Sequence, residues 1–454
     1  MDPVSIFLFS PFPPNTSPSH ASWPCSHLGK YLYGDKDGKI GGDADAPSAE
    51  TEWTIEPQAD GTWALKSAPG FYFHGTGANL TAFVKDLPAD GKWTVVLAMH
   101  PQINLYSVMR KRYVHLQGDE LHCNEDVPWG DDALITLVFF DEHSEGRYGL
   151  MGCNGKYLTA SGRMTEAAGA DAQFLLGFHD DQISLRDAGG SYLSCVGGNG
   201  LLKVNKQRIT KDELFVIQDS EPQFTIKSNS QNKQVSVRSG LEVKANQADV
   251  TDEERFQMEV AKNGTVSFMT NKLKYWAVQD DSSIAAVDTK KSDKTAFTVQ
   301  YDGNRVRYVG PNGKYVTVKP NGALMCNGAG SEAEGIFTMS IINRPEIVLR
   351  GQYGFMGVKP ESRRVTCNQA RGEIFTLTPV DGAYTIALKG QHWSVDGDGV
   401  SATAASGKQF FLEFVELSKC LIKDAESGQY LEGEQNGGVK ATGRGKSINT
   451  LWEF

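Results

Sequence analysis

A repeat of about 40 residues is the feature that most constrains how this chain of 454 residues can fold. Short blocks of the loose form Gly, basic, aromatic, aliphatic recur along the chain, as at 155–158 and 313–316. A second series of aromatic or aliphatic residues keeps the same period from Trp53 to Trp452. Two independent series with one period and one phase indicate eleven copies of a small structural unit.

Each unit is predicted to consist of short strands joined by tight turns. Runs such as 337–341 alternate in polarity, and the dipeptides Asp-Gly at 37–38 and Asn-Gly at 312–313 suit hairpin turns. No stretch keeps a helical period long enough for a major helix. A unit of this kind fits a propeller blade or one lobe of a β-trefoil, a barrel built from three lobes. The Trp-Asp and kelch signatures of propellers are absent from the sequence, which favours the trefoil.

Trefoils need lobes in threes, and eleven units are one fewer than four trefoils require. With the absent lobe placed at the amino end, the sequence predicts an all-β protein of tandem β-trefoils, three complete and the N-terminal one incomplete. An alternative start or an incomplete gene model would explain the difference. The leader carries neither marker, so we expect it to be disordered or to cover an open sheet edge. The expected boundaries are a leader at 1–25, a partial trefoil at 26–99 and trefoils at 100–219, 220–341 and 342–454.

Composition and charge exclude several classes of function. The net charge of −10 disfavours nucleic acid or heparin as a partner, and no run reaches the ~18 apolar residues of a membrane span. Seven scattered cysteines predict free thiols in a reducing compartment rather than a zinc site or a disulfide framework. The run 443–447 ends like a phosphate loop, but Lys440 stands where that motif needs Gly. We expect neither an enzyme nor a metal or cofactor.

Several longer motifs closely resemble the fascin family of actin-bundling proteins, which consist of four tandem β-trefoils. The longest lies at 99–113 and is followed by Asp126-Val-Pro-Trp-Gly130, with shorter matches at 211–215, 342–345 and 451–454. The similarity extends from about Ser26 to Phe454. It implies a monomeric, non-enzymatic, cytoplasmic protein of the cytoskeleton that cross-links F-actin into tight parallel bundles, as in filopodia and other cell projections.

A bundling protein needs at least two filament contacts on separate faces of one stiff body. Because F-actin is acidic, each contact should present Lys or Arg, although such residues are also typical of solvated strand edges. Basic clusters in the second and third trefoils, supported by the resemblance, give a first set of candidates: Arg110, Arg112, Lys203, Lys206, Lys314 and Lys319. The resemblance implies a second set between the first and fourth trefoils: His100, Gln102, Arg350, Lys359, Lys419 and Lys423.

Two features leave alternatives open. Gln352 stands where the family usually has an acidic residue and Glu432 where it usually has Lys, so the second set has weaker support. The aromatic residue repeated in most lobes is expected to fill the floor of each barrel. Its rival interpretation is a carbohydrate-binding, lectin-like trefoil without actin activity, although the lobe ends mostly read Phe-x-aliphatic instead of the Gln-x-Trp of such lectins.

Overall fold

The computed structural model describes residues 21–22, 30–58, 62–76, 79–93, 99–140, 146–179, 182–238 and 240–454. These residues form strands and single-turn 3-10 helices, without an α-helix, and the prediction of an all-β fold of tandem β-trefoils is confirmed. The chain divides into two compact units, Met1–Asp126 with Ile135–Gln218 and Val127–Leu134 with Asp219–Phe454. Within the described ranges, no helix is long and apolar enough to cross a membrane.

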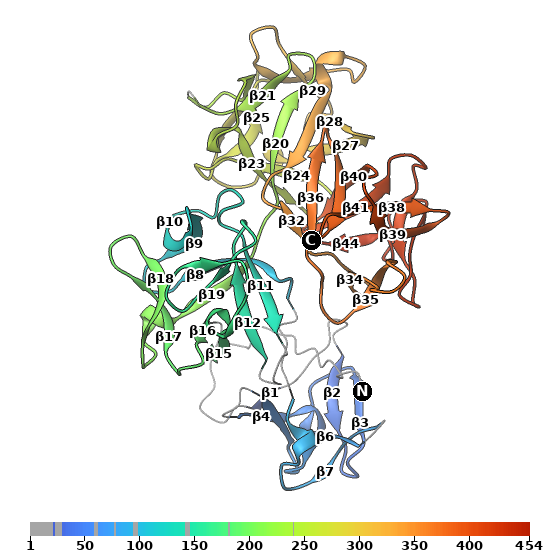
Figure 1. Cartoon of the computed structure of the whole chain (residues 1–454). Coiled ribbons are helices and arrows are strands. Elements are labelled where there is room, and N and C mark those ends of the chain that lie inside the picture. Colours follow the sequence, from blue (N-terminus) through green and yellow to red (C-terminus); the bar gives the residue numbers. More distant parts are fainter. Residues whose placement is uncertain are drawn as a thin grey trace. The chain divides into compact units, whose positions relative to one another are not determined.

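The second trefoil, in the first unit, shows the complete topology. In its barrel β8 pairs with β11 and the path continues through β19 to β16. The pairs β9–β10, β13–β14 and β17–β18 form three hairpins. Figure 1 shows these strands in teal and green. They are β8 (Gln102–Ser107), β9 (Arg112–Gln117), β10 (Glu120–Glu125), β11 (Ile135–Phe140), β12 (Arg147–Met151), β13 (Tyr157–Leu158), β14 (Met164–Thr165), β15 (Leu175–His179), β16 (Gln182–Arg186), β17 (Tyr192–Val196), β18 (Leu201–Lys206) and β19 (Phe215–Asp219).

The third trefoil repeats this order in the second unit. Its strands β20 and β31 pair along five residue positions and close the barrel. The strands are β20 (Gln223–Ser228), β21 (Lys233–Ser236), β22 (Lys244–Gln247), β23 (Arg255–Val260), β24 (Val266–Met269), β25 (Tyr275–Val278), β26 (Ile284–Asp288), β27 (Thr298–Asp302), β28 (Arg305–Val309), β29 (Tyr315–Val318), β30 (Leu324–Gly328) and β31 (Phe337–Ile341).

The fourth trefoil completes the second unit. Its first barrel strand is split in two, and the first of these pieces pairs with β36. The strands are β32 (Glu346–Ile347), β33 (Arg350–Gly351), β34 (Gly354–Val358), β35 (Val365–Gln369), β36 (Phe375–Val380), β37 (Ala383–Leu388), β38 (Gln391–Asp396), β39 (Gly399–Ala404), β40 (Phe410–Glu416), β41 (Lys419–Asp424), β42 (Tyr430–Gly433), β43 (Val439–Gly443) and β44 (Leu451–Glu453).

The described residues before 99 form a smaller sheet system in the first unit. Ala21 and Ser22, from the expected leader, form a strand that pairs antiparallel with Thr54 and Trp53. The rest of the leader lies outside the described residues. The strands are β1 (Ala21–Ser22), β2 (Tyr31–Gly34), β3 (Ile40–Ala44), β4 (Trp53–Pro57), β5 (Trp63–Ser67), β6 (Tyr72–Thr76) and β7 (Asn79–Val84).

A 3-10 turn precedes many of the aromatic residues of the second repeat series. In several turns a Ser or Thr and the residue three positions later exchange hydrogen bonds, as in Thr210 with Glu213 and Thr251 with Glu254, which satisfies exposed backbone donors. Glu213 and Glu254 are fully buried there. The turns are η1 (Ala49–Thr51), η2 (Ala89–Gly91), η3 (Ala170–Ala172), η4 (Lys211–Glu213), η5 (Asp252–Glu254), η6 (Asp293–Thr295) and η7 (Ala333–Gly335).

The expectation that the repeated aromatic residue fills the barrel floor holds for tryptophans such as Trp276 and Trp393, which are buried, but not for most of the tyrosines. Tyr275 and Tyr430 are half-buried, whereas the residues that follow them, Trp276 and Leu431, are buried in the core. The tyrosine hydroxyls bind a side chain on the preceding barrel strand, as Tyr275 binds Glu259 at 3.2 Å. Because strand side chains alternate between faces, a shift of one residue exchanges core for rim.

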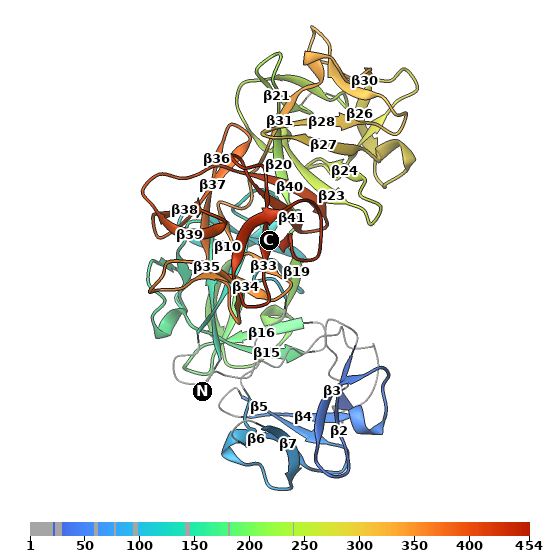
Figure 2. The same cartoon turned by 90° about the vertical axis from the view of Figure 1, so that its right-hand side faces the viewer.

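The third and fourth trefoils share one continuous apolar core. β23 of the third contacts β40 of the fourth, and Figure 2 shows these strands close together. The rings of Phe224 and Phe414 pack edge to face across the boundary, with centroids 4.7 Å apart. The buried hydroxyl of Tyr384 accepts a hydrogen bond from the Ile341 amide at 2.9 Å. The second unit is therefore stabilised across its internal boundary by apolar packing and by directed hydrogen bonds.

Candidate functional site

The turn between β8 and β9 presents the first basic cluster of the second trefoil. The Arg110 guanidinium donates to the carbonyls of Cys195, at 3.4 Å, and of Gly197 and Gly198 in the turn between β17 and β18. Arg112 pairs with Asp126 at 3.1 Å, and both side chains are well exposed. Arg110 therefore joins two turns of the trefoil, whereas Arg112 remains accessible to a partner.

Lys203 and Lys206 lie on β18, directly after the turn that Arg110 contacts. Lys203 is the cross-strand neighbour of Ser194 and is half-buried, and Lys206 is opposite Tyr192 and exposed. Neither ammonium group has an ion-pair partner among the residues that the structure describes. A side chain without an internal partner can pair with an incoming carboxylate without first breaking a bond.

Lys314 and Lys319 flank β29 in the third trefoil and are both exposed. The Lys319 carbonyl accepts a hydrogen bond from the side-chain Nε2 of Gln231 at 2.6 Å, which fixes the backbone of that turn. The Lys319 ammonium also helps to lower the pKa of the Asp281 carboxyl, after the larger effect of hydrogen bonds from Ser283. These two lysines belong to the second unit, whereas Lys203 and Lys206 belong to the first.

His100 and Gln102, which the resemblance placed in the second candidate set, are buried. Their exposed fractions are 6% and 2%, and the His100 Nδ1 accepts a hydrogen bond from the Gln102 amide at 3.3 Å. Buried side chains of this kind order the start of β8. They offer little surface to a filament as the chain stands.

Two residues of the second candidate set lie on neighbouring strands of the fourth trefoil. Arg350 on β33 and Lys419 on β41 are both cross-strand neighbours of Glu453 on β44. Arg350 donates to Glu453 at 2.8 Å, and Lys419 pairs with Glu416 at 3.3 Å. The register therefore places two cations from distant parts of the sequence on either side of Glu453.

Lys446 extends this group and was not recognised from the sequence. Its ammonium lies 2.8 Å from Glu416, and hydrogen bonds from Lys446 and then Lys419 hold the pKa of the Glu416 carboxyl below its ordinary value. The exposed side chains of Leu417 and Ile448 follow closely in sequence. The spacing of Lys446 from Lys419 gives no periodic signal, because a whole hairpin separates them.

The remaining two candidates stand apart from this group. Lys423 lies over the Tyr430 ring, 5.1 Å from its centroid, and 3.9 Å from the Glu413 carboxylate. Lys359 is exposed in the turn after β34, where its backbone bonds to Arg363 and Arg364. Lys423 is thus held by its own trefoil, and Lys359 is accessible.

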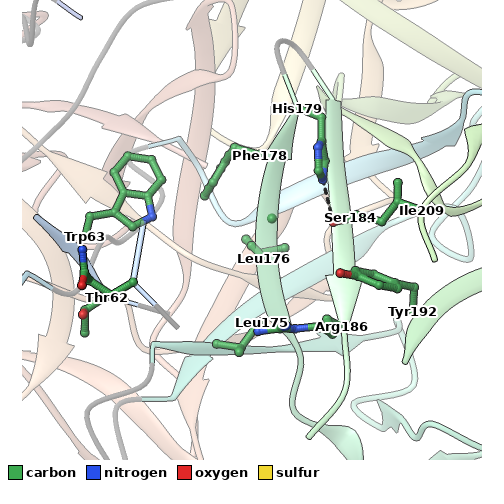
Figure 3. Close-up of a pocket in the computed structure, with 12 residues that line it drawn as sticks. Thr62, Trp63, Leu175, Leu176, Phe178, His179, Ser184, Arg186, Tyr192 and Ile209 are labelled. Carbon is green, nitrogen blue, oxygen red and sulfur yellow. Dashed lines mark hydrogen bonds between the residues drawn. The ribbon is translucent and has the colours of Figure 1, made fainter. Parts of the chain in front are cut away.

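The first unit contains a pocket of about 210 Å³. Trp63 lies on one side of it and faces Phe178, with ring centroids 5.4 Å apart (Figure 3). His179 bonds the Ser184 hydroxyl at 2.9 Å, and Arg186 lies on the same wall. The lining is mixed, with the apolar side chains of Trp63, Leu175 and Phe178 beside the polar side chains of His179, Ser184 and Arg186.

The described residues contain no group of three or more His, Cys, Asp or Glu side chains that could hold a metal ion. The cysteines within the described ranges are free thiols, as the sequence predicted; Cys25 lies outside them. What the arrangement can do chemically is to present separate groups of cations on a β scaffold. Such groups bind acidic surfaces locally although the protein as a whole is acidic.

Comparison with known proteins identifies the scaffold. Fascin-2 from Bos taurus is 36% identical over 443 residues, which cover 94% of this chain and 87% of the relative. Fascin-2 from Homo sapiens is 37% identical, with the same coverage of both chains. Fascin from Strongylocentrotus purpuratus is 32% identical, and the match covers 94% of this chain and 97% of the relative. The sequence profile of the fascin domain matches residues 19–95, 103–217, 230–339 and 352–454. The chain therefore belongs to the fascin family.

Proposed function

We propose that this chain binds actin filaments and cross-links them into tight parallel bundles, as a monomeric structural protein of the cytoplasm and of filopodia-type cell projections. The observation that carries the proposal is the similarity to fascins, which extends over 94% of the chain. The geometry adds two supports, which are cations accessible to a partner and a stiff body that carries them.

Accessible cations occur in both units. Lys203 and Lys206 in the first unit, and Lys314 and Lys359 in the second, have ammonium groups without an ion-pair partner in the part of the chain that the structure describes. An exposed charge pair contributes about 1 kcal/mol or less on its own, so several must act together. We infer that filament binding falls steeply as salt rises, because the Debye length shortens to about 8 Å at physiological ionic strength.

Stiffness is the second support, because a flexible cross-linker would not fix the spacing between filaments. The shared core of the third and fourth trefoils and the Tyr384 to Ile341 hydrogen bond make the second unit resist bending at its internal boundary. In the first unit Arg110 ties two turns of the second trefoil together. The candidate cations are thus mounted on well-packed strands and turns.

Co-sedimentation with F-actin tests the proposal. Low-speed pelleting reports bundles, and high-speed pelleting reports binding to single filaments. We expect the full chain to pellet filaments at low speed. Pelleting only at high speed would reject bundling, and pelleting at neither speed would reject actin binding.

Charge reversal tests which cations contribute. The double variant Lys203→Glu with Lys206→Glu should bind about tenfold more weakly, a loss of about 1.4 kcal/mol, at an unchanged melting temperature. The control variant, Lys262→Glu with Lys272→Glu, makes the same charge change at two exposed lysines outside the candidate sets. Equal loss in both variants would show an effect of net charge alone. No loss in the first variant would reject that surface.

A further inference from the structure

Seven Asn-Gly pairs occur in the sequence, and an asparagine in such a pair can lose its side-chain amide without an enzyme. The backbone nitrogen of the glycine attacks Cγ of the asparagine, and glycine hinders this attack least because it has no side chain. All seven asparagines are exposed, so exposure does not distinguish them. They are Asn154, Asn199, Asn263, Asn312, Asn321, Asn327 and Asn436.

Six of these side chains are held by hydrogen bonds. In five of them Oδ1 accepts from the backbone amide two residues later, as Asn321 does from Ala323 at 3.1 Å. Asn327 lies in β30, and its Oδ1 accepts from the Thr317 hydroxyl at 3.2 Å. Each bond holds Oδ1 in place and so opposes the rotation that an attack on Cγ requires.

Asn199 differs, because its side chain makes no hydrogen bond within the ranges that the structure describes. The residue two positions later, Leu201, begins β18 and pairs with Val196 and His122, so its backbone belongs to the sheet. A Cβ on Gly198 would meet no atom within 4 Å, so the turn is open on this side. The Asn199 side chain is therefore free to rotate.

The attacking nitrogen is also weakly engaged at this site. The Gly200 amide donates to the Gly197 carbonyl at 3.4 Å, whereas the glycine amides at 155, 264, 313, 322 and 437 donate at 2.8 to 3.0 Å. The Arg110 guanidinium donates to the same Gly197 carbonyl and shares it with the Gly200 amide. Both reacting groups are thus freer at Asn199 than in the five other turns.

We propose that Asn199 is a site of spontaneous deamidation, in the turn between β17 and β18 (Figure 1). The Gly200 nitrogen forms a bond to Cγ of Asn199, and the bond from Cγ to Nδ2 breaks. Nδ2 leaves as ammonia with the Gly200 amide proton, and a five-membered succinimide remains. Water then opens this ring at either carbonyl and gives aspartate or isoaspartate. One water enters and one ammonia leaves.

Either product places a negative charge in a turn that binds a cation. The Gly197 and Gly198 carbonyls accept from Arg110, and Lys203 and Lys206 follow on β18. A carboxylate in place of the neutral amide lowers the positive potential at this flank of the trefoil, and an acidic partner is attracted less strongly to such a surface.

Peptide mapping over time tests the proposal without actin. The full folded chain is incubated in mildly alkaline buffer, sampled over weeks and digested at acid pH, so that digestion adds no deamidation. Mass spectrometry measures asparagine, aspartate and isoaspartate at each of the seven sites. We expect Asn199 to react about tenfold faster than any other site, because one net hydrogen bond changes a rate by up to about that factor.

The same incubation in concentrated urea separates the fold from the local sequence. Every site has glycine after asparagine, so we expect the seven rates to become similar in the unfolded chain. A second site that reacts as fast as Asn199 in the folded chain would overturn the proposal. A preference for Asn199 that persists unchanged in urea would overturn it too, because the fold would not be its cause.

The variant Thr265→Val gives a matched test at a second site. Asn263 Oδ1 accepts from the backbone amide of Thr265 at 3.1 Å and from its hydroxyl at 2.8 Å. Removal of the hydroxyl should raise the rate at Asn263 several-fold and leave the rate at Asn199 unchanged. An unchanged rate at Asn263 would contradict the protection by side-chain bonds on which the proposal rests. The wild-type series decides the question even where this variant folds poorly.

Discussion

Trp53 in the first trefoil and Trp452 in the fourth make the same interaction in different surroundings. Each is fully buried and donates its indole N–H at 3.1 Å to a carbonyl 21 residues earlier in the chain, that of Leu32 or Leu431. Among the residues that the structure describes, the buried core around Trp53 has three further members, whereas the core around Trp452 continues through two trefoils. The same local geometry thus occurs with very different amounts of buried apolar surface. We expect the stability of each region to depend on its buried apolar surface.

The largest effect is expected where the core is continuous. Trp452→Ala should destabilise the second unit by about 3–5 kcal/mol, because it leaves a large cavity and an unpaired Leu431 carbonyl. We expect the third and fourth trefoils to lose protection together, as measured by hydrogen exchange over 240–454 in denaturant. Loss confined to the fourth trefoil would show that the shared core does not couple them.

Trp53→Ala should have a smaller and more local effect. The free-energy cost per deleted atom is similar to that at Trp452. Residues 30–93, however, have a small core and therefore little stability to lose, and they make few contacts that would transmit the change. We expect hydrogen exchange over 30–93 to approach that of an unfolded chain, while 240–454 stays as in the wild type. Co-operative loss in both regions would contradict the difference between them.

The hydrogen bond between the third and fourth trefoils gives a sharper test of their coupling. Tyr384→Phe leaves the buried Ile341 amide without an acceptor and should cost about 1–3 kcal/mol. The control is Tyr308→Phe in the same core, because the Tyr308 hydroxyl is buried without a hydrogen-bond partner in the described structure. That variant should be neutral or slightly stabilising in chemical denaturation. Equal destabilisation by both changes would show that only ring packing matters.

The repeat period predicted the fold well because it reflects barrel strands that recur in every lobe. The period does not predict which of two adjacent strand residues points into the core. The second repeat series includes Phe411, yet Phe410 is the buried residue and Phe411 is half-buried. Alternation along a strand has two phases, and two adjacent phenylalanines satisfy both of them.

The candidate site was predictable only in part. Lysines can be counted from the sequence, but their partners depend on long-range register, as with Glu453 between Arg350 and Lys419. Arg110 reaches carbonyls 85 to 88 residues away, which no local pattern encodes. Whether a cation is accessible or already engaged is therefore a property of the tertiary structure.

A half-buried carboxyl at the start of the second unit, that of Glu221, should make the stability of the two regions differ in its dependence on pH. Burial and then the nearby Glu259 charge raise the pKa of Glu221 to about 7, against the opposing charges of Lys291 and Arg344. The folded state therefore holds this proton over a range in which the unfolded chain has lost it. The free energy of unfolding should fall as pH rises from about 4.5 to 7, because the unfolded state binds fewer protons than the folded state over that range. It should level off above pH 7, where neither state holds the proton.

Glu221→Gln removes this dependence, since an amide carries no charge at any of these pH values. We expect the variant to gain about 2 kcal/mol over the wild type at pH 8 and little at pH 4. The gain should appear in the unfolding of 240–454 and leave 30–93 unchanged, because Glu221 belongs to the second unit. The exposed Glu361→Gln removes the same charge without burial and should shift neither region. A gain of equal size at both pH values would mean that Glu221 stays ionised in the folded chain, and that packing rather than proton binding accounts for the change.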